Sequence, residues 1–113
     1  MHAITPVLTF TLRAQGPIIA RRFVAPDGSQ ATHESGAVGI ARTAAADGEA
    51  VAVDALGVLE VEAGSEVAIK DQIGSDADGR AVPNAGFMLA LSAATAAGQT
   101  ILVGPLVCPP FAN

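Results

Sequence analysis

The chain has 113 residues, which fits one domain, and its formal net charge at pH 7 is −5. Its single cysteine, Cys108, excludes an internal disulfide and a zinc site built from cysteines. The acidic balance argues against direct binding of nucleic acid, because carboxylates and phosphates repel one another.

The apolar half of the composition consists mostly of small side chains. Alanine occurs 24 times, whereas there are four phenylalanines and no Trp or Tyr. Because the free energy of burial follows the apolar area removed from water, a core filled with alanine stabilises a fold less than one filled with Leu and Phe. We expect such a chain to gain part of its stability from partner subunits.

Secretion and membrane insertion are not predicted. The first residues, MHAITPVLTFTLRAQG, lack a basic n-region, and Pro6, three threonines and Arg13 interrupt their apolar run. No stretch approaches the roughly 18 apolar residues of a membrane span. We therefore expect a protein made in the cytoplasm, without a membrane partner.

Residues 1–26 predict a β arm or hairpin that packs on a neighbour. Apolar and β-branched residues recur over 4–12 and 18–24, with a break at Gln15-Gly16-Pro17. Residues 25–29 (APDGS) predict a turn, since proline fixes φ and glycine permits a positive φ.

The same segment carries three arginines and no acidic residue. Its formal charge is +3, whereas residues 27–113 carry −8. Guanidinium groups form paired hydrogen bonds with carboxylates, so we predict that Arg13, Arg21 and Arg22 bind an acidic partner surface. For Arg21 and Arg22, a solvated sheet edge is an equally good interpretation.

Residues 27–113 predict a β domain with a proline-rich tail. Glycine or Asp-Gly repeatedly opens a short alternation of Val and Ile, and turn signals about eight to twelve residues apart are typical of a sandwich or barrel. The fold class is therefore all-β, a small β-barrel or β-sandwich with short strands and tight turns. The expected strands lie within 36–42, 48–53, 57–61, 64–69 and 98–103.

Two later segments need separate treatment. Residues 85–97 read either as a helix ending at Gly98 or as a strand over 87–92 followed by a loop, and the alternation of Phe87, Leu89 and Leu91 favours the strand. The tail, residues 104–113, is predicted to leave the sheet, because its prolines lack amide donors.

The stretch GSDADGRA, residues 74–81, has the outline of a phosphate or calcium loop. Arg80 and Ala81 stand where a phosphate loop needs Lys and a hydroxyl, and no acid follows Asp78 to complete a calcium loop. We predict instead a hairpin turn with a left-handed corner at Asp78-Gly79.

The remaining polar residues do not predict a catalytic, metal-binding or cofactor-binding site. His33, Glu34 and Ser35 are consecutive, so their side chains point to opposite faces and cannot converge. Glu60 and Glu62 share one strand face, and with Glu66 they are interpreted as the wet side of a half-buried sheet. We expect a protein that is not an enzyme.

One family resemblance covers more than half of the chain. The run VGIARTAAADGEAVAVDALGVLEVEAGSEVAIKDQIGSDADGRAVPNAG, followed by ALSAATAAGQTILV, resembles the capsid cement, or head decoration, proteins of tailed bacteriophages. The resemblance implies a structural protein that binds the outside of a phage head, commonly as a homotrimer, and holds major capsid protein subunits together. It implies a location in the virion and no cofactor.

A second resemblance belongs to another class. VEAGSEVAIKDQI resembles the rhythm of lipoyl or biotinyl carrier domains, which would be modified at Lys70, the only lysine. Lys70 lacks that family's usual neighbours and is expected within a strand, so the capsid interpretation is preferred.

Overall fold

The computed structural model describes residues 5–32, 36–83 and 88–105, and all regular elements in this part of the chain are β-strands. The all-β prediction is confirmed. No helix long and apolar enough to cross a membrane occurs among the described residues. The strands are β1 (Thr5–Arg13), β2 (Phe23–Val24), β3 (Gly39–Ala41), β4 (Ala50–Glu62), β5 (Gln72–Ser75), β6 (Ala81–Pro83), β7 (Met88–Ala90) and β8 (Thr100–Pro105).

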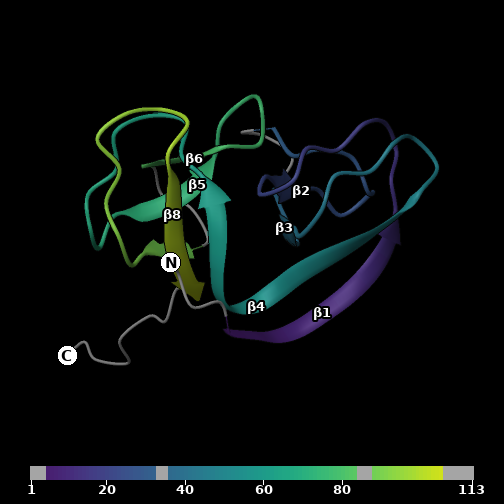
Figure 1. Cartoon of the computed structure of the whole chain (residues 1–113), viewed down its shortest axis with the longest axis horizontal. Helices are drawn as coiled ribbons and strands as arrows, with labels where there is room; N and C mark the ends of the chain where they lie inside the picture. The colour runs from purple at the N-terminus through teal and green to yellow at the C-terminus, as the bar shows by residue number, and fades with distance from the viewer. Residues whose placement is uncertain (1–4, 33–35, 84–87, 106–113) are drawn as a thin grey trace.

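The strands form one antiparallel sheet that curls into a nearly closed barrel (Figure 1). Its order is β2-β3-β4-β8-β7-β5-β6, and β1 adds to β4. A parallel bridge between Ala63, just after β4, and Ala81 in β6 brings the two ends of the sheet together. At this bridge Gly64 N donates to Ala81 O at 2.7 Å. The predicted small barrel is therefore what this sequence forms.

Strand β4 belongs to two separate cores. Val51 and Val53, in its first half, pack in a core with residues of the 14–45 region, whereas Leu59 and Val61, in its second half, lie inside the barrel. Between the halves the strand passes Gly57, whose φ of 121° allows the bend seen in Figure 1. One continuous strand thus ties both cores together.

Strands β2 and β3 form the wall between these cores. Phe23 faces the barrel core and Val24 the second core, and Ile40 and Ala41 divide in the same way. This follows from the period of two along a strand, which sends neighbouring side chains to opposite faces. Many of the buried positions are alanines, as the composition predicts.

The amino-terminal segment pairs with later parts of its own chain. Within the described residues, 5–12 and 18–24 do not pair with each other: β1 pairs with β4 over Thr5 to Arg13, and Ile18 bridges Ala45. Figure 1 shows β1 and the first half of β4 as a long curved ribbon. The packing of this segment on a neighbour and its boundary at residue 26 stay predictions.

Two expected strand boundaries are wrong. The segments 48–53 and 57–61 belong to one strand, because the positive φ of Gly57 bends the backbone without ending the pairing. The segment 64–69 is not a strand: only Val67 makes a bridge, to Ala94, and the chain then turns at Lys70. Apolar alternation over so few residues is satisfied equally well by a loop that buries Val67.

The strand interpretation of 87–92 is confirmed for Met88–Ala90, which form β7, whereas Leu91 and Ser92 already belong to the loop that follows. Phe87 lies outside the described residues. The expectation that the tail leaves the sheet at residue 104 is wrong by two positions, because Gly104 and Pro105 still pair with β7. Proline is tolerated at the end of a strand, where no further ladder bond is required. The remainder, 106–113, lies outside the described residues.

Candidate interaction surface

Arg13 ends strand β1 at one tip of the ribbon. Its Nη1 donates to Gly48 O at 2.6 Å, and its side chain is exposed. Nearby, Gly16 N donates to Asp47 Oδ1 at 2.8 Å, so this tip carries both signs of charge. Arg13 is therefore held in place by a backbone carbonyl while its guanidinium faces solvent.

Arg21 and Arg22 are adjacent in sequence but differ in environment. Arg21 has a left-handed φ of 63°, and its Nε lies 3.3 Å from Glu60 Oε1 with 56% of the side chain exposed. Arg22 has only 16% of its side chain exposed and pairs with Glu62. Its Nη1 also donates to Asp78 O at 3.3 Å. Arg22 thus donates its hydrogen bonds to groups within the fold, whereas the side chain of Arg21 is largely accessible to solvent.

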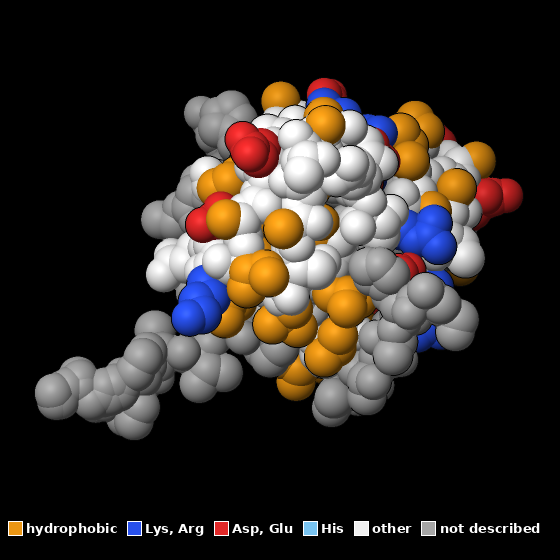
Figure 2. Space-filling model, turned by 60° about the vertical axis from the view of Figure 1, so that its left-hand side comes forward, with side chains coloured by type: hydrophobic (Ala, Val, Ile, Leu, Met, Phe, Trp, Pro, Cys, Tyr) orange, Lys and Arg blue, Asp and Glu red, His pale blue; other side chains and the backbone are white. Residues whose placement is uncertain are grey.

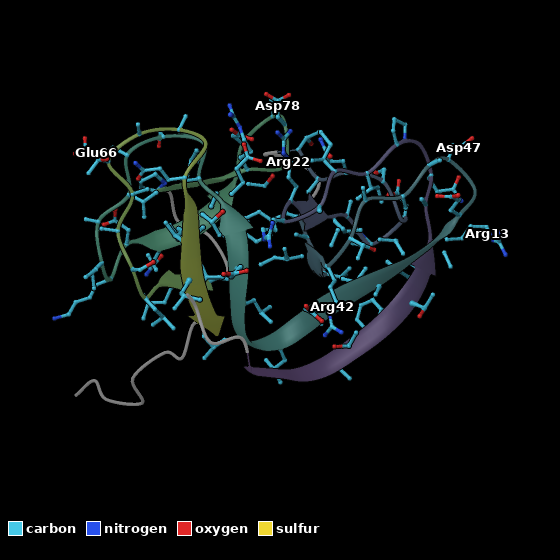
Figure 3. All side chains as sticks on the ribbon, in the orientation of Figure 1. Arg13, Arg22, Arg42, Asp47, Glu66 and Asp78 are labelled. Atoms are coloured by element: carbon cyan, nitrogen blue, oxygen red, sulfur yellow. The ribbon has the colours of Figure 1, made fainter. Side chains whose placement is uncertain are left out.

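The predicted arginines do not form one cluster. Figure 3 places Arg13 beside Asp47 at one end of the molecule and Arg22 beside Asp78 on another side. An acidic partner would meet Arg13 and Arg21 at separate points.

The stretch 74–81 forms the hairpin that the sequence predicts. β5 and β6 pair antiparallel around it, and Gly79 has a φ of 80°. The carboxylate of Asp76 is turned into the loop, where its Oδ1 accepts hydrogen bonds from Asp78 N and Arg80 N, both at 2.8 Å. This carboxylate satisfies the backbone of the turn.

The acidic face of β4 is half-buried, as expected, but it is not simply solvated. Glu60 pairs with Arg21, and Glu62 lies between Arg22 and Arg80, with 3.8 Å from its Oε2 to Arg80 Nη1. Glu66, by contrast, is exposed on the loop after β4. The paired carboxylates therefore fix the chain before β2 and the 76–80 hairpin onto the end of β4.

A buried carboxylate in the ribbon escaped the sequence interpretation. Asp54 accepts from Thr9 Oγ1 at 2.7 Å and from Arg42 Nη2 at 2.7 Å. The hydrogen bonds that Arg42 donates to Asp54, and then the negative charge of Asp54, raise the pKa of Arg42 above its ordinary value. The available signal was a lone acid in the apolar run AVAVDAL. This network joins β1, the residue after β3, and β4.

Exposed apolar side chains mark the other end of the ribbon. Leu8 in β1 and Leu56 in β4 are cross-strand partners, and they are 50% and 44% exposed. Register shifts on both sides of Leu8 and the bend at Gly57 turn these side chains outward. Leu91 is also exposed, over Gly104. Figure 2 shows hydrophobic side chains gathered on one face of the molecule.

Lys70 lies in an exposed turn rather than in a strand, so its expected placement is wrong. Asp71 N donates to Ala68 O at 3.1 Å across this turn, and the φ of Lys70 is 79°.

Within the described ranges, no three His, Cys, Asp or Glu residues lie close enough to hold a metal ion. The sequence His33-Glu34-Ser35 lies outside these ranges.

Comparison with known proteins decides the family. A family model described as "Phage cement protein" matches residues 2–105. The chain belongs to the phage cement protein family. This cement protein therefore has a structural role on the phage capsid: it is located in the virion and binds capsid proteins.

Among solved structures, the cement protein is similar to the N base of head fiber gp8.5 in bacteriophage phi29. The TM-score is 0.70 at 24% sequence identity, and the match covers 89% of this chain and 98% of that chain. At this identity the likeness establishes a shared fold. No curated protein matches the cement protein. The carrier alternative has no support from either comparison.

Proposed function

We propose that this cement protein attaches as a homotrimer to the outside of the phage head and clamps neighbouring major capsid protein subunits together, without catalysing a reaction. The family match over residues 2–105 carries the proposal. The role requires synthesis in the host cytoplasm before attachment.

Two features of the fold suit such a clamp. Strand β4 runs unbroken through both cores, so force applied to one half of the molecule is passed to the other along the covalent chain and its ladder. The buried side chains are mostly small, which leaves stability to be gained from a partner. Many weak attachments on one shell act together against internal pressure.

Arg13 and Arg21 are the contact residues that this proposal favours, because their guanidinium groups face solvent. Arg22, also predicted from the sequence, supports the contact indirectly. Its ion pair with Glu62 and its hydrogen bond to Asp78 O hold the backbone that positions Arg21. An acidic partner surface would complement the +3 charge of residues 1–26.

Heads that lack the protein provide the test. Purified protein is added back, occupancy is measured by co-sedimentation, and image averaging by electron microscopy locates the bound copies. We expect saturable binding in threes at local threefold positions and a higher temperature of DNA release. Failure to sediment with heads would contradict the capsid role, whereas binding as separate monomers would contradict only the trimer.

A further inference from the structure

Strand β1 has one edge on β4 and a second edge that is open within the described part of the chain. The sheet order ends there, since β1 pairs with β4 alone. Figure 1 shows β1 on the outside of the ribbon. An open strand edge presents unpaired N–H and C=O groups to which another strand can add.

The register identifies which backbone groups face outward. Ala14 N donates to Glu49 O at 2.8 Å, which sets the phase of the β1–β4 ladder, and Leu12 opposite Val51 keeps this phase. In an antiparallel pair, every second residue turns its hydrogen-bonding groups away from the partner. Thr9, Thr11 and Arg13 therefore turn their backbone groups outward. Gly28 packs directly against Arg13 O, and Gln15 N donates to Gly28 O, so the turn at 25–28 covers the edge at Arg13. Thr9 and Thr11 carry the open groups.

The neighbouring strand confirms this phase independently. Thr11 is opposite Ala52, and Ala52 O accepts from Arg42 N at 2.9 Å on the far side of β4. Because Ala52 directs its groups away from β1, Thr11 must direct its own groups away from β4.

Little protects this part of the edge. Proteins guard open edges with proline, bulges or charges. Pro6 and the register shifts around Leu8 guard only the first half of β1. From Thr9 to Leu12 the register is regular and the residues carry no charge. These four residues present an extended edge of about 14 Å, which ends where the turn at Gly28 covers Arg13.

We propose that an extended segment of a capsid subunit adds as a strand to the Thr9–Leu12 edge of β1. The proposal rests on the proposed function and names the surface that performs it. The outward N–H and C=O groups of Thr9 and Thr11 supply the ladder, and Leu8 with Leu56 supplies an apolar contact at the end of the same ribbon.

The side chains define the chemistry of the added strand. Thr9 and Thr11 are exposed and alternate along β1. The hydroxyl of Thr9 is already bonded to Asp54 and Arg42, so the Thr11 side chain is the one available to a cross-strand partner. Because pairs of Thr with Thr or Ser stabilise a ladder, the matching segment carries a hydroxyl or β-branched residue opposite Thr11.

A second copy of the chain fits this edge less well. An edge of four residues is far smaller than the roughly 800 Å² per partner of a stable interface, so it would not by itself hold two free molecules together. A shell that offers the same segment many times, and contacts the protein elsewhere, does not have this limit.

The variant Thr11→Pro tests the edge directly. Proline removes the outward N–H of Thr11 and adds bulk at the edge, yet it leaves every β1–β4 hydrogen bond in place. Thr11→Val is the matched control, because it keeps the N–H and favours a strand. We expect Thr11→Pro to bind heads at least about tenfold more weakly than wild type, since about 1.4 kcal/mol per tenfold is the scale of one hydrogen bond. Thr11→Val should bind like wild type.

Hydrogen exchange on wild-type protein gives a readout that does not depend on the variant folding. In free protein, the amides of Phe10 and Leu12 should exchange slowly and those of Thr9 and Thr11 fast. On heads, the second group should become slow as well. Wild-type binding without this added protection, or normal binding of a folded Thr11→Pro protein, would overturn the proposal.

Two further outcomes separate the proposals. If Thr11→Pro instead converts a free oligomer to monomers and leaves head binding intact, the edge pairs copies of this chain and the capsid strand is ruled out. If wild-type protein does not bind heads at all, the proposed function fails, and the inference fails with it.

Discussion

Arg22 donates from Nε to Glu62 Oε1 at 3.2 Å and from Nη2 to Glu62 Oε2 at 3.4 Å, so a two-pronged pair joins the chain before β2 to the last residue of β4. Glu62 N also donates to Arg21 O at 2.8 Å, which fixes the same two segments through the backbone. The wall between the cores is thereby anchored at the end of the strand that both cores share.

Arg22→Ala should destabilise the fold by about 1–3 kcal/mol, because it leaves the carboxylate of Glu62 with one distant partner, Arg80, in a site where both side chains of the original pair are less than a quarter exposed. Thermal unfolding would register this as a fall in Tm of roughly 5–15 °C. Arg21→Ala is the control, since the Arg21 side chain is 56% exposed, against 14% for its partner Glu60, and an ion pair with a solvent-exposed member contributes about 0–1 kcal/mol. Equal losses in both variants would contradict the role given to Arg22.

Gly79→Ala should cost about 2–3 kcal/mol of stability. The φ of 80° strains any L side chain, and a Cβ there would lie 2.9 Å from Gln30 Cγ and 3.3 Å from Phe23 O. The hairpin would have to move away from β2, where Phe23 N donates to Gly79 O. Chemical denaturation measures the loss.

Gly98→Ala is the matched control for this prediction. Its φ is 93°, but nothing lies within 4 Å of the position of an added Cβ. Only the backbone strain applies, about 1–2 kcal/mol. A loss as large as that of Gly79→Ala would mean that contacts around Gly79 do not matter.

The turn at 25–28 should respond to acid. Hydrogen bonds from the hydroxyl of Ser29, and then from its backbone N–H, hold the pKa of Asp27 below its ordinary value. The contribution of this carboxylate is therefore complete above the ordinary pKa of about 3.9 and is lost as the pH falls through the lower folded-state value. A carboxyl carbon titration by NMR measures the folded-state value.

Ser29→Ala should raise the pKa of Asp27 toward its ordinary value, though not fully, because the backbone N–H of residue 29 still donates. Ser65→Ala, which removes a hydroxyl that donates to Glu66 O, should leave it unchanged. An unchanged pKa in Ser29→Ala would contradict the assigned cause.

Local chemistry explains which features could be predicted from the sequence. The turns at Gly28 and Gly79 have positive φ, as the Asp-Gly pairs indicate, and the strands follow the alternation of Val and Ile. The partner of β1 could not be predicted, because pairing depends on which core Phe10 and Leu12 fill, and that core includes residues up to Val53. Asp54 escaped for the same reason, since its partners Thr9 and Arg42 come from distant segments.

The three predicted arginines illustrate the same limit at the candidate surface. A charge asymmetry in sequence identifies a basic segment, but it cannot tell an arginine whose side chain is 16% exposed from a neighbour at 56%. Their separation arises from the left-handed φ of Arg21, which turns consecutive side chains to different environments. Reversing both charges together would therefore mix a loss of contact with a loss of stability.

Single charge reversals separate these effects. Arg13→Glu and Arg21→Glu should each lower occupancy on heads, most strongly at low ionic strength, because a carboxylate would then face the acidic partner surface that we propose. Lys70→Glu is the matched control: it changes the net charge by the same amount at an exposed turn, where Lys70 N donates to Ala90 O at the end of β7. Co-sedimentation at about 0.05 M and 0.5 M salt measures the effect, and Debye screening predicts that the differences shrink at the higher concentration. If Lys70→Glu weakens binding as much as the arginine variants do, attachment depends on total charge and not on these two residues.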